Sequence, residues 1–265
     1  MFTVLGFRLA ASLARLLPNP LSEGLAVATA RLAFDCRVPA RAALEANLAR
    51  LLPSLPRARR ARLARRAFEN FARSFATFLG HGRRPGRLRV VGARNLAAAR
   101  SSGRGVIVLS AHLGNWERGA AELAALGIPI HLAARPQRHA RLEALFSARR
   151  AAAGVGLLPA GTLLSSASGA LRRAEWVALM ADRGTSGTGS GSVCAWAAAL
   201  ARRTGALLLP AILVLEPGGG HRLVVEAPIE AGECRDGQFR RTMRRWLERW
   251  PDQWAAFEPL PGGLA

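Results

Sequence analysis

The stretch GVIVLSAHLGNWERGAAELAAL, residues 105–126, joins a short apolar run to an alanine-rich segment. The run at 106–109 is continuous and rich in β-branched residues, which is typical of a strand buried on both faces. From residue 116 onward, apolar residues recur at helical spacing. The stretch therefore predicts a strand, a turn that Gly114 permits, and a helix, which together are the repeating unit of a parallel α/β sheet.

A histidine and a carboxylate stand where this strand would end and the helix begin. Glu117 falls in the first helical turn, where the helix dipole favours a negative charge, and Asn115 is expected as the N-cap. We expect Glu117 to fold back onto one imidazole nitrogen of His112, so that the other nitrogen can deprotonate a substrate hydroxyl. The alternative is a capping histidine beside a solvated glutamate. A zinc site is not indicated, because no second histidine follows His112 at helical spacing.

The rest of the chain repeats the alternation of strand and helix. Strand patterns occur near residues 105–110, 129–134, 156–160, 176–181, 206–215 and 221–226, with helical patterns between most of them. This order predicts an α/β fold with a mainly parallel mixed sheet flanked by helices. Functional loops in such sheets lie at the carboxyl ends of the strands. We therefore expect His112, Arg135 and Asp182, which all follow strands, to converge on one edge of the sheet.

Two apolar stretches separated by prolines precede these strands. Residues 1–17 are interrupted by two arginines, and residues 21–34 are short and include charged side chains, so neither is a good membrane span. We expect residues 1–35 to form membrane-associating amphipathic helices that lie in the interface, and residues 36–265 to form the main domain. The alternative is an ordinary helix that packs on the core.

The chain is strongly basic, with a net charge of +21 and a pI of about 11.9, and it contains arginine but no lysine. This charge favours anionic partners: phospholipid headgroups, phosphorylated glycolipids, an acidic carrier protein or nucleic acid. The densest basic run, residues 57–66, continues into an apolar stripe with Phe71 and Phe75, which is typical of an amphipathic helix at an anionic membrane surface. An ordinary solvated face is the alternative. A nucleic-acid-binding protein is the rival class, but the sequence contains no motif for it and no tyrosine.

Six motifs occur in the order that they have in a known enzyme family. They are LEANLARLLP (44–53), AHLGNWE (111–117), RPQRHARLEALFSARRAAAG (135–154), WVALMADRG (176–184), LARRTGALLLPAILV (200–214) and PDQWAAFEP (251–259). Together they resemble the bacterial lipid A late acyltransferases and their relatives, which include the mycobacterial phosphatidylinositol mannoside acyltransferases. An ordered set that extends over most of the chain is more specific than any single motif.

The resemblance implies an O-acyltransferase at the cytoplasmic face of the bacterial inner membrane, with the main domain as its acyltransferase domain. Such an enzyme moves a fatty acyl chain from acyl carrier protein or coenzyme A to a hydroxyl of a lipid A-type or other glycolipid precursor, without a resident cofactor. His112 would be the general base and Glu117 its orienting partner. Asn115 is a candidate donor to the developing oxyanion. Arg135 would bind a phosphate, and Asp182 would support the site.

Other members of the shared motifs are expected to have structural roles. These residues are Asn47, Gln253 and Trp254.

The sequence departs from the family pattern after Asp182. Arg183 stands where the family commonly has glutamine or asparagine, and the glycine-rich run 184–192 lacks the aromatic residues that relatives carry near the acyl pocket. The run also lacks the lysine of a phosphate-binding P-loop, so we interpret it as a flexible loop or lid. The nearest alternative enzyme is a glycerolipid acyltransferase, which uses a histidine and an aspartate at this spacing. Glu117 and the Gly-Asn-Trp sequence before it favour the lipid A type.

Overall fold

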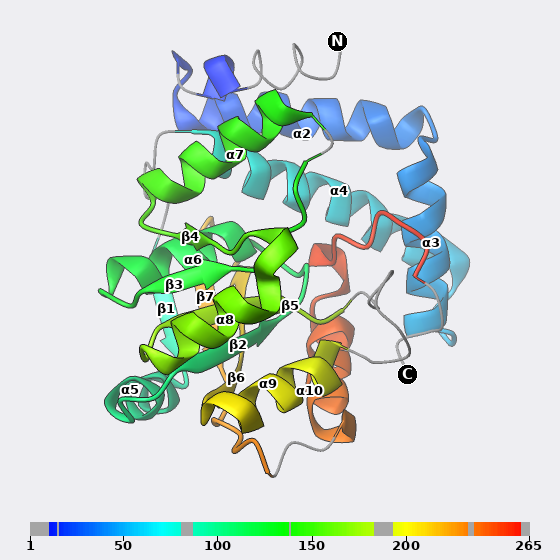
Figure 1. Ribbon diagram of the computed structural model, residues 1–265. Coiled ribbons are helices and arrows are strands. Elements are labelled where there is room, and N and C mark those ends of the chain that lie inside the picture. The colour runs from blue at the N-terminus through cyan, green and yellow to red at the C-terminus, as the bar shows by residue number, and fades with distance from the viewer. Residues whose placement is uncertain are drawn as a thin grey trace.

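The computed structural model describes residues 11–14, 16–80, 87–137, 139–182, 193–232 and 236–260. Its strands form a seven-stranded sheet in the order β1-β7-β6-β2-β5-β3-β4, parallel throughout except between β6 and β7 (Figure 1). The strands are β1 (Leu88–Val91), β2 (Val106–Ser110), β3 (Ile130–Leu132), β4 (Gly156–Leu157), β5 (Trp176–Met180), β6 (Leu207–Leu215) and β7 (His221–Val225). The expected α/β class with a mainly parallel mixed sheet is confirmed.

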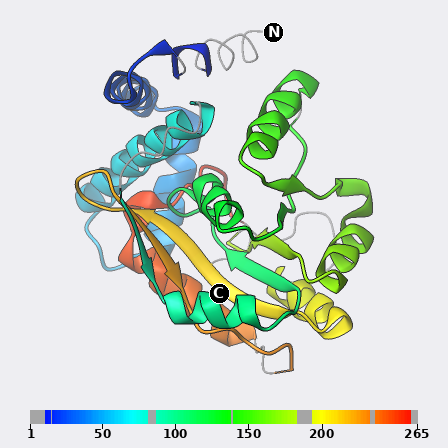
Figure 2. The same ribbon diagram turned by 90° about the vertical axis from the view of Figure 1, so that its left-hand side faces the viewer.

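Helices cover both faces of the sheet, and a further helical layer lies at one end of the molecule (Figure 1). The helices are α2 (Asn19–Asp35), α3 (Pro39–Leu51), α4 (Arg57–Leu79), α5 (Ala93–Ser101), α6 (Trp116–Ala125), α7 (Ala140–Ala152), α8 (Leu163–Arg172), α9 (Val193–Thr204) and α10 (Asp236–Arg249). Two short 3-10 helices are η1 (Ala160–Thr162) and η2 (Pro251–Gln253). Figure 2 shows α4 and α7 rising on either side of α6.

The central strand β2 lies between β5 and β6, and all of its residues are buried. Ile107 and Leu109 belong to the hydrophobic cluster that includes residues of α3, α8, α9 and α10. Val106 and Val108 belong to the cluster on the opposite face, which includes residues of α5 and α6. Successive side chains of a strand point to opposite faces, so the continuous apolar run reflects burial on both. This confirms the interpretation of the run from the sequence.

The edges of the sheet differ from the sequence expectation. β1 is a strand that the patterns above do not predict, and it pairs with β7 only. It has four residues that alternate between half-buried and exposed, so it gives a weak apolar signal. The strand pattern at 156–160 is reduced to the two residues of β4 at the other edge.

The N-terminal helix α2 packs along α4 and leaves a row of leucines exposed. On its inner side, Val27 and Phe34 are buried, and Phe34 joins the main core. On its outer side, Leu21, Leu25 and Leu32 are 60%, 45% and 65% exposed. At 3.6 residues per turn these three leucines share one face of the helix. None of the helices in the described ranges is long and apolar enough to cross a membrane.

Candidate functional site

The loop that follows β2 is held against β6 through its backbone. Gly114 has a φ of +69°, and a Cβ atom there would lie 2.1 Å from the carbonyl oxygen of Leu213. Only glycine fits this approach without a shift of the loop. The backbone nitrogen of Asn115 donates to the same oxygen at 2.8 Å. The turn expected at Gly114 is therefore confirmed, and it fixes the position of the residues around it.

Asn115 caps α6, as the sequence predicts. Its Oδ1 accepts a hydrogen bond from the backbone nitrogen of Arg118 at 3.1 Å. The residue is buried, and its Nδ2 has no hydrogen-bond partner within the described part of the chain. A buried amide nitrogen without a partner is uncommon, because its desolvation is uncompensated. The capping role accounts for one end of the amide and leaves its donor end available.

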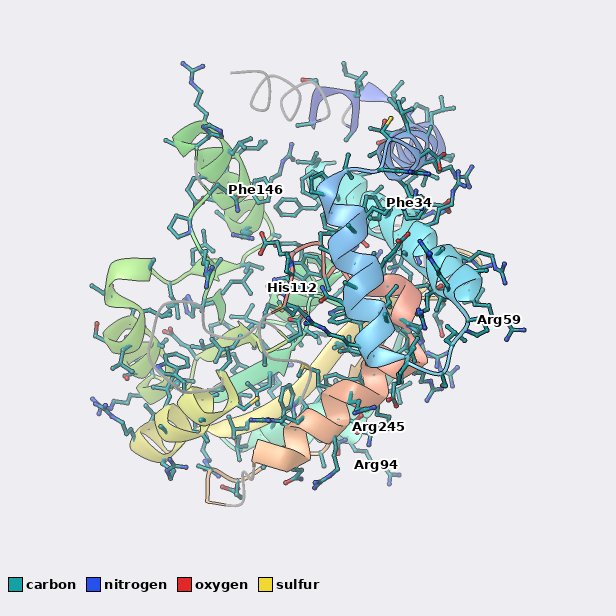
Figure 3. The ribbon with its side chains drawn as sticks, turned by 90° about the vertical axis from the view of Figure 1, so that its right-hand side faces the viewer. Phe34, Arg59, Arg94, His112, Phe146 and Arg245 are labelled. Carbon is teal, nitrogen blue, oxygen red and sulfur yellow. The ribbon has the colours of Figure 1, made fainter. Side chains whose placement is uncertain are left out.

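The side chain of His112 is bonded to the carboxylate of Asp182. The distance from Nδ1 to Oδ1 is 2.8 Å, and the backbone nitrogen of His112 donates to the same oxygen at 3.0 Å. The other oxygen, Oδ2, accepts from the indole nitrogen of Trp254 at 3.1 Å. The Asp182 side chain is completely buried, whereas that of His112 is 22% exposed. The pair thus has a buried carboxylate and a partly exposed imidazole. His112 is labelled near the middle of the molecule in Figure 3.

The surroundings of Asp182 favour its ionised form. Burial by itself raises the pKa of this carboxyl, but the adjacent His112 and the hydrogen bonds from His112 and Trp254 outweigh it, so the pKa lies below its ordinary value. An ionised carboxylate accepts and does not donate, so the neutral imidazole carries its proton on Nδ1. Nε2 is then the nitrogen that can take up a proton, which is the state a general base requires.

The contact between His112 and Asp182 follows from strand register. β2 and β5 are parallel neighbours, and Ser110 is paired with Met180 at their carboxyl ends. His112 and Asp182 each lie two residues beyond this pair. The expected convergence is thereby confirmed for these two residues. Arg135 follows β3, which lies next to β5 in the sheet, and it is exposed.

Glu117 does not make the expected bond to His112. Its carboxylate accepts two hydrogen bonds from Arg150 of α7, at 2.6 Å to Nη2 and 3.1 Å to Nε. Both side chains are mostly buried, at 13% exposed for Glu117 and 9% for Arg150. A bidentate guanidinium satisfies a buried carboxylate better than one imidazole does. In addition, Nδ1 of His112 is already bonded to Asp182. The prediction that Glu117 orients the imidazole is therefore wrong, and Asp182 occupies that position.

The closing segment of the chain completes the loop around His112. The backbone carbonyl of His112 accepts from Ala255 at 2.8 Å, beside the indole of Trp254 that reaches Asp182. The Gln253 side chain makes two bonds to the backbone of Leu215 on β6, at 2.8 Å to the nitrogen and 2.9 Å to the oxygen. Trp254 therefore contacts the site through Asp182, while Gln253 has the structural role expected of it.

Asn47 of α3 anchors the same segment from the other side. Its Nδ2 donates to the backbone oxygens of Ala256 at 3.0 Å and Glu258 at 2.9 Å. Its Oδ1 accepts from the backbone nitrogen of Leu260 at 3.4 Å. These bonds explain why an asparagine in an early motif accompanies a motif near the end of the chain.

A row of half-buried aromatic rings leads away from the imidazole. The Trp116 ring meets His112 edge-on at 5.2 Å and lies 6.1 Å from Phe71 of α4. Phe71 stacks on Phe75 at 5.7 Å, and Phe75 lies 6.1 Å from Phe78. We call Trp116, Phe71, Phe75 and Phe78 the ring row. The apolar stripe predicted on α4 is thus exposed in part beside the site rather than fully buried in the core.

α7 adds a ring to this row from the opposite side. Phe146 lies 5.9 Å from Phe75 and 5.1 Å from Phe78. Figure 3 places Phe146 between His112 and the end of the molecule formed by the N-terminal helices. The contact joins helices that are distant in sequence, so no local pattern in the sequence indicates it.

Within the described ranges, no group of three His, Cys, Asp or Glu side chains could hold a metal ion. Two other histidines lie in different surroundings: His131 pairs with Glu175 at 2.8 Å, and His221 is buried beside Arg118. Arg183 and the glycine-rich run 184–192, interpreted as a loop or lid, lie outside the described residues.

One comparison with known proteins bears on this site. The family model described as bacterial lipid A biosynthesis acyltransferase matches residues 2–259. The matched range includes the N-terminal helices, the sheet and the closing segment around His112. None of the curated proteins matches the sequence.

Proposed function

The chain belongs to the bacterial lipid A biosynthesis acyltransferase family, and we propose that it transfers a fatty acyl chain from an acyl thioester to a hydroxyl of a lipid A-type or other glycolipid precursor. The observation that carries the proposal is the pair of His112 and Asp182, in which a buried, ionised carboxylate orients a partly exposed imidazole. This is the arrangement that general-base activation of a hydroxyl needs.

In the proposed reaction, Nε2 of His112 takes the proton of the acceptor hydroxyl while the hydroxyl oxygen attacks the thioester carbonyl. Asp182 stabilises the imidazolium that forms, since its carboxylate is already bonded to Nδ1. Collapse of the tetrahedral intermediate breaks the carbon–sulfur bond, and the thiolate that leaves receives the proton from Nε2. The acceptor itself is the nucleophile, so no acyl-enzyme forms.

Asn115 is the side chain that we assign to the oxyanion. It is the N-cap of α6, three residues after His112, and its Nδ2 has no partner within the described residues. An amide donor aimed at the developing charge stabilises the transition state more than the ground state. The dipole at the start of α6 would act in the same direction.

The ring row is our candidate binding surface for the acyl chain. Its rings begin at the imidazole edge and continue along α4, and each is only partly buried. An alkyl chain bound against these rings would bury apolar surface of the chain and of the rings. This burial stabilises the complex by about 25 cal/mol for each Å² of apolar surface removed from water. An acyl chain bound in this position would bring the thioester carbonyl of the donor next to His112.

Arg135 is our candidate for binding an acceptor phosphate. It follows β3, which lies next to β5 in the sheet, and it is exposed. A guanidinium can bind two phosphate oxygens at once, which fixes the orientation of the acceptor as well as its charge.

The leucine face of α2 is the surface that we expect to rest on the membrane. The three exposed leucines lie on the outer side of the helical layer, and the chain carries a net charge of +21. Apolar contact with the acyl region and attraction to anionic headgroups act together in interfacial binding. A glycolipid acceptor could then reach the site without leaving the bilayer.

The test is mass spectrometry of lipid products from the purified full chain in detergent. Wild type, His112→Ala and a control, Glu122→Gln, are incubated with acyl carrier protein and coenzyme A thioesters and a bacterial lipid extract. An acyl-sized mass gain that requires His112 and survives in the control supports the proposal. Equal gain in wild type and His112→Ala would refute His112 as the base. Acylation of lysophosphatidate instead of a glycolipid would identify a glycerolipid acyltransferase.

A further inference from the structure

α7 makes almost no contribution to the hydrophobic core. Only Leu142 and Arg150 are buried among its 13 residues. No residue of this helix belongs to either core cluster. A helix with so little apolar burial has low local stability, and its position depends on the few specific contacts that it makes.

Side-chain contacts tie α7 to α6 and α4. Arg150 binds Glu117 at the start of α6 through two hydrogen bonds of 2.6 and 3.1 Å. Arg149 donates to the backbone oxygen of Gly80, just beyond α4, at 3.2 Å. The ion pair is the strongest of these contacts, because both hydrogen bonds join charged groups that are mostly shielded from water.

Arg150 links the ion pair to the ring row. Its guanidinium carbon lies 5.8 Å from the centre of the Phe146 ring, and Phe146 in turn contacts Phe75 and Phe78. Glu117 directly follows Trp116, the first ring of the row. The ion pair of Glu117 and Arg150 therefore connects the ring beside the imidazole, Trp116, with the ring supplied by α7, Phe146.

We propose that Glu117 is a positioning residue for the acyl chain: through Arg150 it fixes α7, so that Phe146 forms a wall of the ring row. The inference rests on the proposed acyl transfer, because that reaction places the chain against these rings. Asp182 already holds Nδ1 of His112, so Glu117 is not required to orient the base. Glu117 then governs which acyl chains bind, and Asp182 governs the protonation of His112.

This role predicts how the pair responds to mutation. Removal of one partner leaves the charge of the other buried without compensation. Replacement of both partners leaves no uncompensated buried charge. Glu117→Gln and Arg150→Met should each loosen α7, and the double variant should recover much of the loss. Glu122→Gln is the matched control, because it removes the pair between Arg118 and Glu122 on the same helix, which does not involve α7.

The first measurement is hydrogen exchange of the α7 backbone amides in the full chain. Each single variant is expected to exchange about tenfold faster than wild type across residues 140–152, and the double variant less so. The control should match wild type in α7. This measurement does not depend on activity, so it tests the positioning role even if acyl transfer is not observed.

The second measurement compares binding of acyl-CoA thioesters of increasing chain length, followed by tryptophan fluorescence. Each single variant should bind long chains several-fold more weakly while short chains change little, and the pH dependence of turnover should stay that of wild type. Unchanged exchange in α7 would overturn the proposal, as would unchanged chain-length preference. A shifted pH profile of turnover in Glu117→Gln but not in Arg150→Met would indicate that Glu117 acts on the protonation of His112, and it would contradict the positioning role. Absence of transfer by wild type with every donor would instead count against the proposed function.

Discussion

One oxygen of Asp182, Oδ1, accepts hydrogen bonds from both the ring Nδ1 and the backbone nitrogen of His112, at 2.8 and 3.0 Å. The bond from the backbone fixes the position of this oxygen relative to His112. Rotation of the ring would break the bond between Nδ1 and Oδ1. Trp254 holds the second carboxylate oxygen and prevents the aspartate from turning. The imidazole that we propose as the base is thus held by residues from three separate segments of the chain.

Asp182→Asn is expected to reduce turnover about 10²- to 10⁴-fold while the protein stays folded. The amide cannot stabilise an imidazolium, and it can stabilise the tautomer that has its proton on the wrong nitrogen. Steady-state acyl transfer over a pH range checks this, with Glu122→Gln as the control. Turnover close to that of wild type would contradict a role for Asp182 beside the base.

Acid should destabilise the protein through His221. Burial, followed by the positive charge of Arg118, lowers the pKa of this histidine from 6.5 to about 4. The unfolded chain therefore binds a proton as the pH falls below 6.5, whereas the folded chain does so only near 4. The free energy of unfolding should decrease across this window and then level off for this group. Thermal unfolding of wild type and His221→Asn at several pH values checks it, because the variant should lose this part of the slope.

Gly114→Ala and Gly103→Ala separate backbone strain from steric conflict. Both glycines have positive φ, +69° and +65°, but only the Cβ at Gly114 would meet another atom within 4 Å, the Leu213 oxygen at 2.1 Å among others. We expect Gly103→Ala to cost about 1–2 kcal/mol without loss of activity. Gly114→Ala should cost more and reduce turnover about 10²-fold, because the loop that carries His112 must move. Equal effects in urea unfolding and turnover would contradict this.

Asn47→Ala should lower the free energy of unfolding by about 2–4 kcal/mol. The variant leaves the backbone groups of Ala256, Glu258 and Leu260 without their bonds to the asparagine. Asn70→Ala is a useful comparison, because its side chain makes only one of its two described bonds to this segment, from Nδ2 to the backbone oxygen of Asp252, and the other is accepted from Arg73 on the same helix. Its loss should be nearer 1 kcal/mol. Urea unfolding of both variants measures the difference, and equal losses would argue against the anchoring role of Asn47.

Replacement of Leu21, Leu25 and Leu32 by serine should weaken binding to phosphatidylglycerol vesicles by about 100-fold or more. Each substitution removes an exposed apolar side chain from one face of α2. Leu164→Ser is the control, since Leu164 is also 45% exposed but lies on α8. Sedimentation with the vesicles measures both variants. Equal binding by the triple variant and wild type would exclude the α2 face as the membrane contact.

The sequence predicts the parts of the site that depend on nearby residues or on strand order. The continuous run of β2, the turn at Gly114 and the cap at Asn115 are local patterns, and all three are confirmed. The meeting of His112 and Asp182 follows from the rule that parallel strands end at one edge. Strand order alone does not reveal the atoms in contact, because that needs the register of β2 and β5.

The partner of Glu117 could not be predicted in this way. The spacing in the sequence places this glutamate near His112, but the guanidinium that binds it comes from α7, 33 residues later. Competition between two partners depends on where a distant helix packs, and periodicity does not encode this. The same holds for Phe146, whose contacts with α4 join elements without a shared local pattern.

The bond from Trp254 to Asp182 has a consequence for partial unfolding. The segment that carries this indole is held against α3 by the two bonds from Asn47. Local opening that releases this segment would free the aspartate while β2 and β5 are still paired. The orientation of the imidazole should therefore be lost at a lower urea concentration than the sheet itself.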